Sequence, residues 1–185
     1  MSRPPDNPTA RVFFALWPTV AESGALAAWQ VPLKQLCGGR AMRGETLHLT
    51  LVFIGGIERP RLEALRLAAQ EVSVESFELC FDRAHYWGRN KIVYASPDQV
   101  PPQLARLVNA LEQSLAKHGF KCDEREHKPH ITLLRNARGT EVELKVVQPV
   151  TWQARDFALV ESVPQGALMG YRVLDRFPLE RTGCA

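Results

Sequence analysis

The chain has 185 residues, of which 45% are hydrophobic and 23% are charged, with 23 Lys and Arg against 20 Asp and Glu. A chain of this size buries about two-thirds of its unfolded surface, so folding requires neither disulfides nor a structural metal. The net charge of +3 is too small to indicate a duplex-binding surface, but it suits an anionic small substrate.

Residues 1–10 contain three prolines and few apolar side chains, which predicts a disordered leader followed by one domain over residues 11–185. This start lacks a secretory signal pattern, and no run approaches the roughly 18 apolar residues of a membrane span. We therefore expect a cytoplasmic protein without a membrane partner. The four cysteines form no Cys-x-x-Cys pair, which disfavours a zinc or redox site.

The first part of the chain begins with a short buried strand over residues 12–17, which are apolar and aromatic. Three further elements are expected after it. A helix is predicted over 20–36, where Pro32 predicts a kink or an early stop. Residues 46–54 alternate between apolar and polar side chains, which predicts a strand closed by two glycines. A periodic helix follows over about 60–72.

The second part begins with strands over 76–86 and 91–96, joined by a hairpin turn. Pro101 starts a third helix that Gly119 ends. Three further strands are expected, over 129–135, 150–162 and 170–177. Strands and helices do not alternate regularly, so the pattern predicts an α+β fold with antiparallel sheets. Each half repeats a strand, a helix and a strand with one polar face, which predicts two pseudo-symmetric lobes.

Two tetrads of the form His, aliphatic, Thr, aliphatic stand out: HLTL at 48–51 and HITL at 130–133. Two such tetrads arise by chance in about one of a thousand shuffled sequences of this composition. Residues i and i+2 of a strand face the same way, so each His shares a face with its Thr while the aliphatic residues anchor the strand in the core. The repetition indicates paired catalytic histidines held by rigid strands.

Other uses of histidine fit this pattern less well. A lone histidine of this kind is usually structural and bonded to a carbonyl, but two matching tetrads favour catalysis. Paired histidines can also hold a metal, yet the tetrads contain no carboxylate and no helical HExxH spacing. We expect neither a metal nor a cofactor, because one neutral and one protonated histidine suffice for acid–base catalysis near neutral pH.

At this point the sequence resembles the 2H phosphoesterase superfamily, and within it the bacterial RNA 2',3'-cyclic phosphodiesterases, also called 2'-5' RNA ligases. The resemblance covers about residues 11–180 and rests on both tetrads and on the text around them: RVFFAL at 11–16, LHLTL followed by FIG at 47–55, and PHITLLR at 129–135. It implies a bilobal fold around a central cleft. It also implies a substrate, either RNA with a 2',3'-cyclic phosphate end or a small cyclic nucleotide, and a monomeric enzyme.

The same resemblance implies roles for the tetrads. His48 would protonate O3' and His130 would accept a proton from water, which opens the cyclic phosphate to a 2'-phosphate. Thr50 and Thr132 would hold the phosphate oxygens. With the roles reversed, the same histidines would join a cyclic end to a 5'-hydroxyl in a 2'-5' linkage. The spacing alone does not orient the two histidines.

Three further residues are expected at the substrate. Arg135 follows the second tetrad and can pair with phosphate or stack on a base, with a surface salt bridge as the alternative. Phe13 is expected to flank the base opposite Arg135, because the small Ala15 on the same strand face leaves room beside it. Arg43 is a weaker candidate for contact with the RNA backbone.

The remaining histidines are expected to lie outside the chemistry. His127 is expected at the rim of the site, and His85 and His118 to be structural. Two rival functions stay open at this stage: a non-catalytic module that binds RNA ends, and a 2H phosphodiesterase for another cyclic or 2'-5'-linked nucleotide.

Overall fold

The computed structural model describes residues 8–122, 126–140, 144, 148–166 and 168–181. Two four-stranded antiparallel sheets and one two-stranded sheet form the framework, in the orders β10-β9-β1-β3, β2-β7-β6-β5 and β4-β8. The strands are β1 Thr9–Leu16, β2 Arg40–Ala41, β3 Leu49–Glu58, β4 Phe77–Phe81, β5 Arg83–Trp87, β6 Ile92–Ser96, β7 Ile131–Arg135, β8 Val150–Ala154, β9 Asp156–Gln165 and β10 Leu168–Pro178. The α-helices are α1 Val20–Ala28, α2 Gln30–Cys37, α3 Leu62–Gln70 and α4 Pro102–Lys117, and the 3-10 helices are η1 Gly44–Thr46 and η2 Arg59–Arg61.

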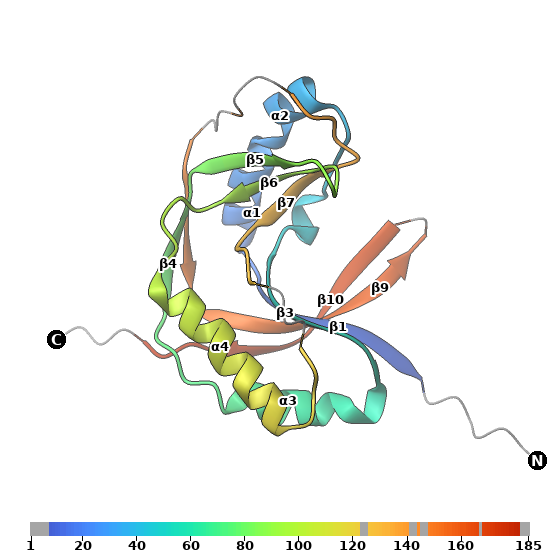
Figure 1. Cartoon of the computed structure of the whole chain (residues 1–185), viewed down its shortest axis with the longest axis vertical. Coiled ribbons are helices and arrows are strands. Elements are labelled where there is room, and N and C mark those ends of the chain that lie inside the picture. The colour runs from blue at the N-terminus through green and yellow to red at the C-terminus, as the bar shows by residue number, and fades with distance from the viewer. Residues whose placement is uncertain (1–7, 123–125, 141–143, 145–147, 167, 182–185) are drawn as a thin grey trace, which may run out of the picture.

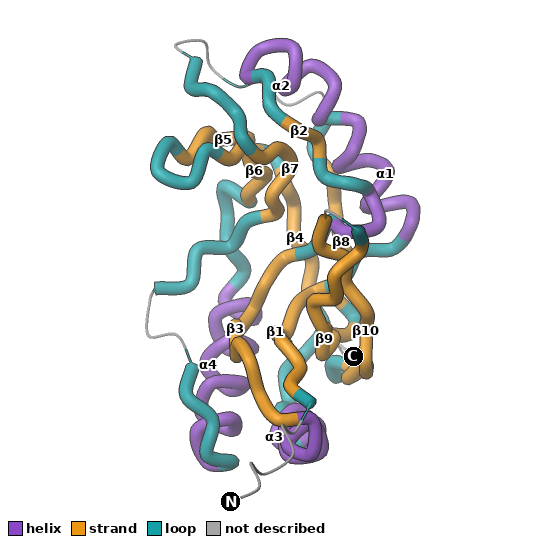
Figure 2. The backbone as a smooth tube through the Cα atoms, turned by 90° about the vertical axis from the view of Figure 1, so that its right-hand side faces the viewer, coloured by secondary structure: helices purple, strands orange, loops and turns teal. Residues whose placement is uncertain are grey.

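The molecule has two lobes, each built from one four-stranded sheet and one pair of helices (Figure 1). The helices α1 and α2 lie at one end of the molecule, and α3 and α4 lie at the other, as the perpendicular view also shows (Figure 2). This confirms the predicted α+β class and the two lobes. The lobes are not the two halves of the sequence, however, because β9 returns to pair with β1, and β10 pairs with β9 at the edge of the same sheet.

The helix predicted over residues 20–36 is two helices that meet at Trp29. Pro32 is the third residue of α2, where it lacks the N–H that would bond to the carbonyl of Ala28 and where its ring would clash with that carbonyl. The break therefore falls one turn before the proline. Trp29 is buried at the junction, and its Nε1 donates to the carbonyl of Gln148 at 2.9 Å.

The strand expected over residues 46–54 begins later and runs further than its sequence indicates. The pairing of β1 with β3 skips Leu51 and Ile54, so β3 contains two bulges. Gly55, with φ of +90°, continues the strand where it was expected to end. The first bulge also puts Phe53, instead of Val52, on the same face as Thr50.

Other boundaries also differ from the sequence prediction. The segment 76–86 is two strands in different sheets, since β4 pairs with β8 and β5 pairs with β6. The strand predicted over 150–162 is likewise two strands, since β8 pairs with β4 whereas β9 pairs with β1 and β10. Order was expected to begin at Arg11, but β1 begins at Thr9, and Ala10 is buried against the sheet. Residues 1–7 of the predicted leader lie outside the described residues. The hairpin turn before β6, the helix α4 and the strand β7 are confirmed.

A carboxylate on β9 is buried in the first four-stranded sheet. Glu161 is 3% exposed, and it accepts hydrogen bonds from the guanidinium groups of Arg59 and Arg172, at 2.5 and 2.6 Å. Burial opposes ionisation of Glu161, but the hydrogen bond from Arg172 and the positive charges of both arginines outweigh it and lower the pKa of this carboxyl. The pair of arginines thus ties η2 and β10 to the centre of the sheet.

The lowered pKa of Glu161 predicts a pH-dependent contribution to stability. A carboxyl with a folded pKa below its unfolded value stabilises the fold above the unfolded pKa, and the effect disappears as pH falls through the folded pKa. We expect Glu161→Gln to lower the free energy of unfolding by about 1–2 kcal/mol at pH 7, with a smaller difference from wild type below about pH 4. Urea denaturation across this range measures it, with Glu126→Gln, an exposed carboxyl, as control. An equal loss at pH 7 and pH 3 would contradict the account.

Candidate active site

The two tetrads meet at one cavity of about 380 Å³ between the lobes. His48 and Thr50 reach it from β3 and the residue before it, and His130 and Thr132 reach it from the equivalent positions of β7. Arg135, the last residue of β7, lines the same cavity. Phe13 lines it as well, so the structure brings together six of the seven side chains that the sequence predicted for the site.

Both histidines are held by the same local hydrogen bond. Nδ1 of His48 lies 2.8 Å from the carbonyl oxygen of Thr46, and Nδ1 of His130 lies 2.7 Å from that of Lys128. A carbonyl can only accept, so each histidine carries its proton on Nδ1 and donates it to the residue two positions earlier. This tautomer leaves Nε2 of each ring as the atom that can accept or deliver a proton.

The ring of His48 is enclosed by aromatic side chains. Trp17 stacks on it with 5.2 Å between ring centroids and an interplanar angle of 4°, while Phe13 and Tyr171 contact it at 5.0 and 4.9 Å. Burial lowers the pKa of His48 to about 4, and the nearby charges of His130 and Arg135 act in the same direction. The hydrogen bond to the Thr46 carbonyl only partly offsets this shift.

The ring of His130 is less enclosed. Trp87 and Tyr94 contact it edge-on, at centroid distances of 5.8 and 5.6 Å. Burial also lowers the pKa of His130, with smaller contributions of the same sign from His127 and Arg135. Both imidazoles are therefore neutral at pH 7 when the cavity holds no anion.

Arg135 is placed to bring positive charge to both histidines. Its charge lowers the pKa of His48 and of His130, although the two rings stand on different lobes. An anion in the cavity would meet this guanidinium together with the hydroxyls of Thr50 and Thr132. Planar guanidinium groups and hydroxyl donors are the protein groups that hold a phosphate. The site is thus suited to a phosphate ester between two proton-transfer groups.

Phe13 lines the cavity and its contact with a base stays a prediction, but the space expected beside Ala15 is absent. Its side chain is at the site, but it is only 3% exposed and packs against His48 and Tyr171. Ala15 leaves no room for a ligand beside it, because this alanine is fully buried in a small cluster with Phe13 and residues of β9. Phe13 therefore packs against the ring of His48 in the wall of the cavity.

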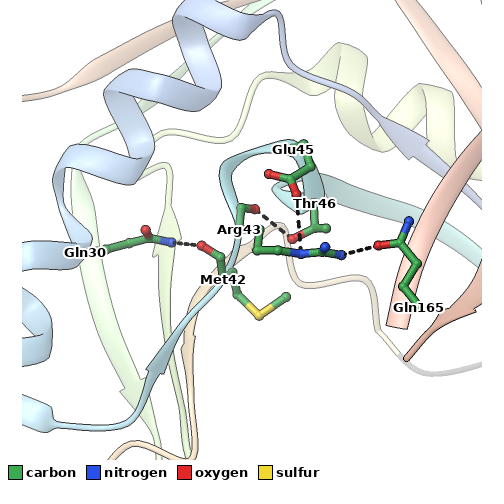
Figure 3. Close-up of polar contacts among 6 residues, drawn as sticks. All are labelled: Gln30, Met42, Arg43, Glu45, Thr46 and Gln165. Atoms are coloured by element: carbon green, nitrogen blue, oxygen red, sulfur yellow. Dashed lines mark hydrogen bonds and ion pairs between the residues drawn. The ribbon is translucent and has the colours of Figure 1, made fainter. Parts of the chain in front are cut away.

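The contact of Arg43 with the RNA backbone stays a prediction. This side chain does not line the cavity; instead its Nη2 donates to Oε1 of Gln165 at 2.7 Å, and its Nε pairs with Glu45 at 3.4 Å (Figure 3). The carbonyl of Arg43 accepts a bond from the hydroxyl of Thr46, the residue whose own carbonyl holds His48. Arg43 links the loop before the first tetrad to the β9–β10 hairpin, so its guanidinium is engaged within the protein.

The predicted rim histidine connects the two tetrads. Nε2 of His127 donates to the carbonyl of Thr50 at 2.9 Å, which ties the chain before β7 to β3 of the other lobe. His85 lies exposed on β5, and His118 ends α4 with a hydrogen bond to Glu71 at 2.8 Å. Neither of these two lines the cavity, as predicted.

Sequence reasoning missed several residues that line the cavity. Arg11 and Phe53 are two of them, with the guanidinium of Arg11 5.1 Å from the centroid of the Phe53 ring. Arg11 could have been found from its alternation with Phe13 on β1, whereas Phe53 depends on a bulge that the sequence does not reveal. Tyr171 and Met169 come from β10, more than a hundred residues away from the first tetrad, and no local signal indicates them.

Comparisons with known proteins agree with this geometry. The family model of the 2'-5' RNA ligase superfamily matches residues 17–164. The chain is similar to the RNA 2',3'-cyclic phosphodiesterase of Escherichia coli (strain K12), with 33% identity over 127 residues that cover 69% of this chain and 72% of the relative. A relative of the same name from Archaeoglobus fulgidus is 26% identical over 147 residues, 74% of this chain and 82% of the relative.

A solved structure shows the same likeness. The crystal structure of E. coli LigT complexed with 3'-AMP superimposes with a TM-score of 0.84 at 28% identity, over 93% of this chain and 99% of that chain. Within the described part of this chain, no three His, Cys, Asp or Glu side chains gather in a way that could hold a metal ion. No helix among those residues is long and apolar enough to cross a membrane.

The enclosure of His48 predicts its titration. In the protein without ligand we expect the imidazole of His48 to titrate near pH 4 and to show a protonated Nδ1 and a bare Nε2 at pH 7, measured by ¹⁵N NMR of the ring nitrogens. Trp17→Leu should raise this pKa toward 6.5, because the lost indole admits water. The matched variant Trp87→Leu should raise the pKa of His130 instead. Nε2 protonation of His48 at pH 7 would contradict the assigned hydrogen bond.

Proposed function

Because the chain belongs to the 2'-5' RNA ligase superfamily, we propose that it is an RNA 2',3'-cyclic phosphodiesterase, which opens cyclic phosphate ends by hydrolysis. The observation that carries this proposal is the pair of histidines with the same tautomer, each with Nε2 available, on opposite lobes of one cavity. The name of the E. coli relative and the 3'-AMP in the LigT crystal support a nucleotide phosphate as the ligand.

The reaction is an in-line displacement at phosphorus. His130 accepts a proton from water as the water oxygen forms a bond to phosphorus, and the bond from phosphorus to O3' breaks. His48 donates a proton to O3', so the product carries a 2'-phosphate and a free 3'-hydroxyl. The hydroxyls of Thr50 and Thr132 and the guanidinium of Arg135 hold the nonbridging oxygens, on which negative charge accumulates in the transition state.

The substrate itself supplies the negative charge that the free site lacks. Both imidazoles are neutral in the protein alone because burial and Arg135 lower their pKa values. A phosphate diester brings one negative charge between them, which raises both pKa values and favours a proton on one ring. Two neutral bases thus become one acid and one base when the substrate binds.

The same site has a reverse reaction. When the 5'-hydroxyl of another nucleotide replaces water, His130 accepts its proton and the product is a 2'-5' phosphodiester. Water outcompetes this acceptor unless the acceptor is bound, so hydrolysis is the default reaction.

The proposal places the enzyme in the cytoplasm as a cofactor-free monomer. Its support is the state of the cysteines: Cys37, Cys80 and Cys122, which the structure describes, are free thiols, as is usual in a reducing compartment. The acid–base chemistry of the two histidines requires no metal ion.

The lowered pKa values predict an acidic optimum. The profile of kcat/KM against pH reports the free protein, where one histidine must be neutral and the other protonated. We therefore expect a bell for 2',3'-cyclic AMP whose centre lies below pH 6.5, since both pKa values are lowered. The profile of kcat should lie at higher pH because the bound phosphate raises both values. A kcat/KM bell centred above pH 6.5 would refute this electrostatic account.

The proposed roles predict different losses for different variants. His48→Ala and His130→Ala should each lower kcat by about 100-fold to 10,000-fold, because each removes a proton-transfer group. Thr50→Ala and Thr132→Ala should cost about 10-fold, since each removes one neutral hydrogen-bond donor. His85→Ala, on the exposed face of β5, is the matched control and should retain wild-type turnover.

A changed leaving group separates the two histidines. In a cyclic analogue with sulfur in place of O3', the leaving atom needs no proton, so His48→Ala should recover at least about 10-fold more activity than His130→Ala. Rescue of His130→Ala instead would exchange the roles, and wild-type turnover by either alanine variant on the normal substrate would overturn the two-histidine mechanism.

A further inference from the structure

The surroundings of the two histidines differ. The ring of His48 packs against Phe13, Trp17 and Tyr171, and Phe13 and Tyr171 also line the main cavity. His130 instead borders a second pocket of about 170 Å³, whose other walls are Tyr86, Trp87, Tyr94 and Lys128. The local hydrogen bonds that hold the two rings are alike, so the open flank of His130 is a specific departure from the symmetry of the site.

This second pocket has the chemistry of a nucleobase site. Three of its five walls are aromatic, and Trp87 and Tyr94 lie 5.9 Å apart between ring centroids. Bases stack on such rings without regard to sequence. Its volume equals that of about six water molecules in the liquid, which suits a ring system better than a whole nucleotide. Lys128 is exposed at the edge and places a positive charge where a phosphate of the same ligand would lie.

The position of the pocket decides which group it would hold. In an in-line displacement the entering oxygen approaches from the side opposite the leaving O3', which is the side of His130. Anything attached to the entering oxygen must therefore extend past His130. Water needs no space there, so a pocket on this flank is unnecessary for hydrolysis alone.

We infer that the pocket of Tyr86, Trp87 and Tyr94 binds the base of a second nucleoside, whose 5'-oxygen takes the place of water at phosphorus. This inference rests on the proposed function and on His130 as the group that faces the entering oxygen. In the joining direction the bond from O5' to phosphorus forms and that to O3' breaks, while His130 takes the proton of the 5'-hydroxyl and His48 gives one to O3'. In the reverse direction the 3'-hydroxyl attacks phosphorus and gives its proton to His48, O5' leaves with a proton from His130, and a 2'-5' linkage is cleaved to a 2',3'-cyclic end.

The test compares two substrates that differ only on this flank. 2'-5'-linked ApA fills both pockets, whereas 2',3'-cyclic AMP fills only the main cavity. We expect Trp87→Leu to lower kcat/KM for ApA cleavage about 10-fold more than it lowers kcat/KM for cyclic AMP hydrolysis. Tyr86→Leu, on a wall of the same pocket, should shift the ratio in the same direction and serves if Trp87→Leu does not fold.

Two control variants frame this comparison. Trp17→Leu, on the closed flank of His48, should lower both reactions by the same factor because it acts only through that ring. Arg89→Ala, in the exposed turn before β6, should change neither reaction.

The outcomes distinguish a failure of the second base site from a failure of the proposed function. Equal losses in both reactions for Trp87→Leu and Tyr86→Leu would show that the aromatic walls only position His130, which overturns the second base site. A wild-type protein that hydrolyses 2',3'-cyclic AMP but leaves 2'-5' ApA intact would also overturn it, with the proposed function standing. A protein inactive on both substrates would defeat the proposed function itself.

Discussion

The site depends on one short hydrogen bond, made twice: an imidazole Nδ1 donates to the carbonyl two residues earlier in the chain. Each histidine lies just before its strand, where the backbone can turn the carbonyl of the residue two positions earlier toward the ring. The next residue then enters the sheet, with Leu49 and Ile131 fully buried as anchors. The tautomer, the free Nε2 and the position of the following threonine all follow from this arrangement.

The second determinant is the burial of charge without a counter-ion. Among the described residues the cavity is lined by two arginines and two histidines but by no carboxylate, and burial together with the nearby positive charges lowers the pKa of both imidazoles. A site of this kind is unfavourable for cations and favourable for one phosphate anion. Arg135 acts twice in this scheme, because its charge adds to the effect of burial on the free histidines and it then binds the anion that allows one of them to become charged.

The features that the sequence predicted correctly are those with local signals. The tetrads, the helix α4 and the hairpin before β6 each have a pattern within about 20 residues, and all three lie where expected. The bulges of β3 and the break at Trp29 depend on pairing and sterics that a hydrophobic pattern does not report. Ring contacts on His48 were missed for a different reason: Tyr171 reaches it only after β10 has crossed back to β9, which is a tertiary event.

The central claim is that two histidines open the cyclic phosphate with water alone. The most direct measurement hydrolyses RNA with a 2',3'-cyclic phosphate end in ¹⁸O-labelled water with excess EDTA, followed by chromatography and mass spectrometry of the terminal nucleotide. The account predicts undiminished turnover and a 2'-phosphate that carries one ¹⁸O atom. Activity lost with EDTA and restored by a divalent ion, or a product with a 3'-phosphate, would contradict it.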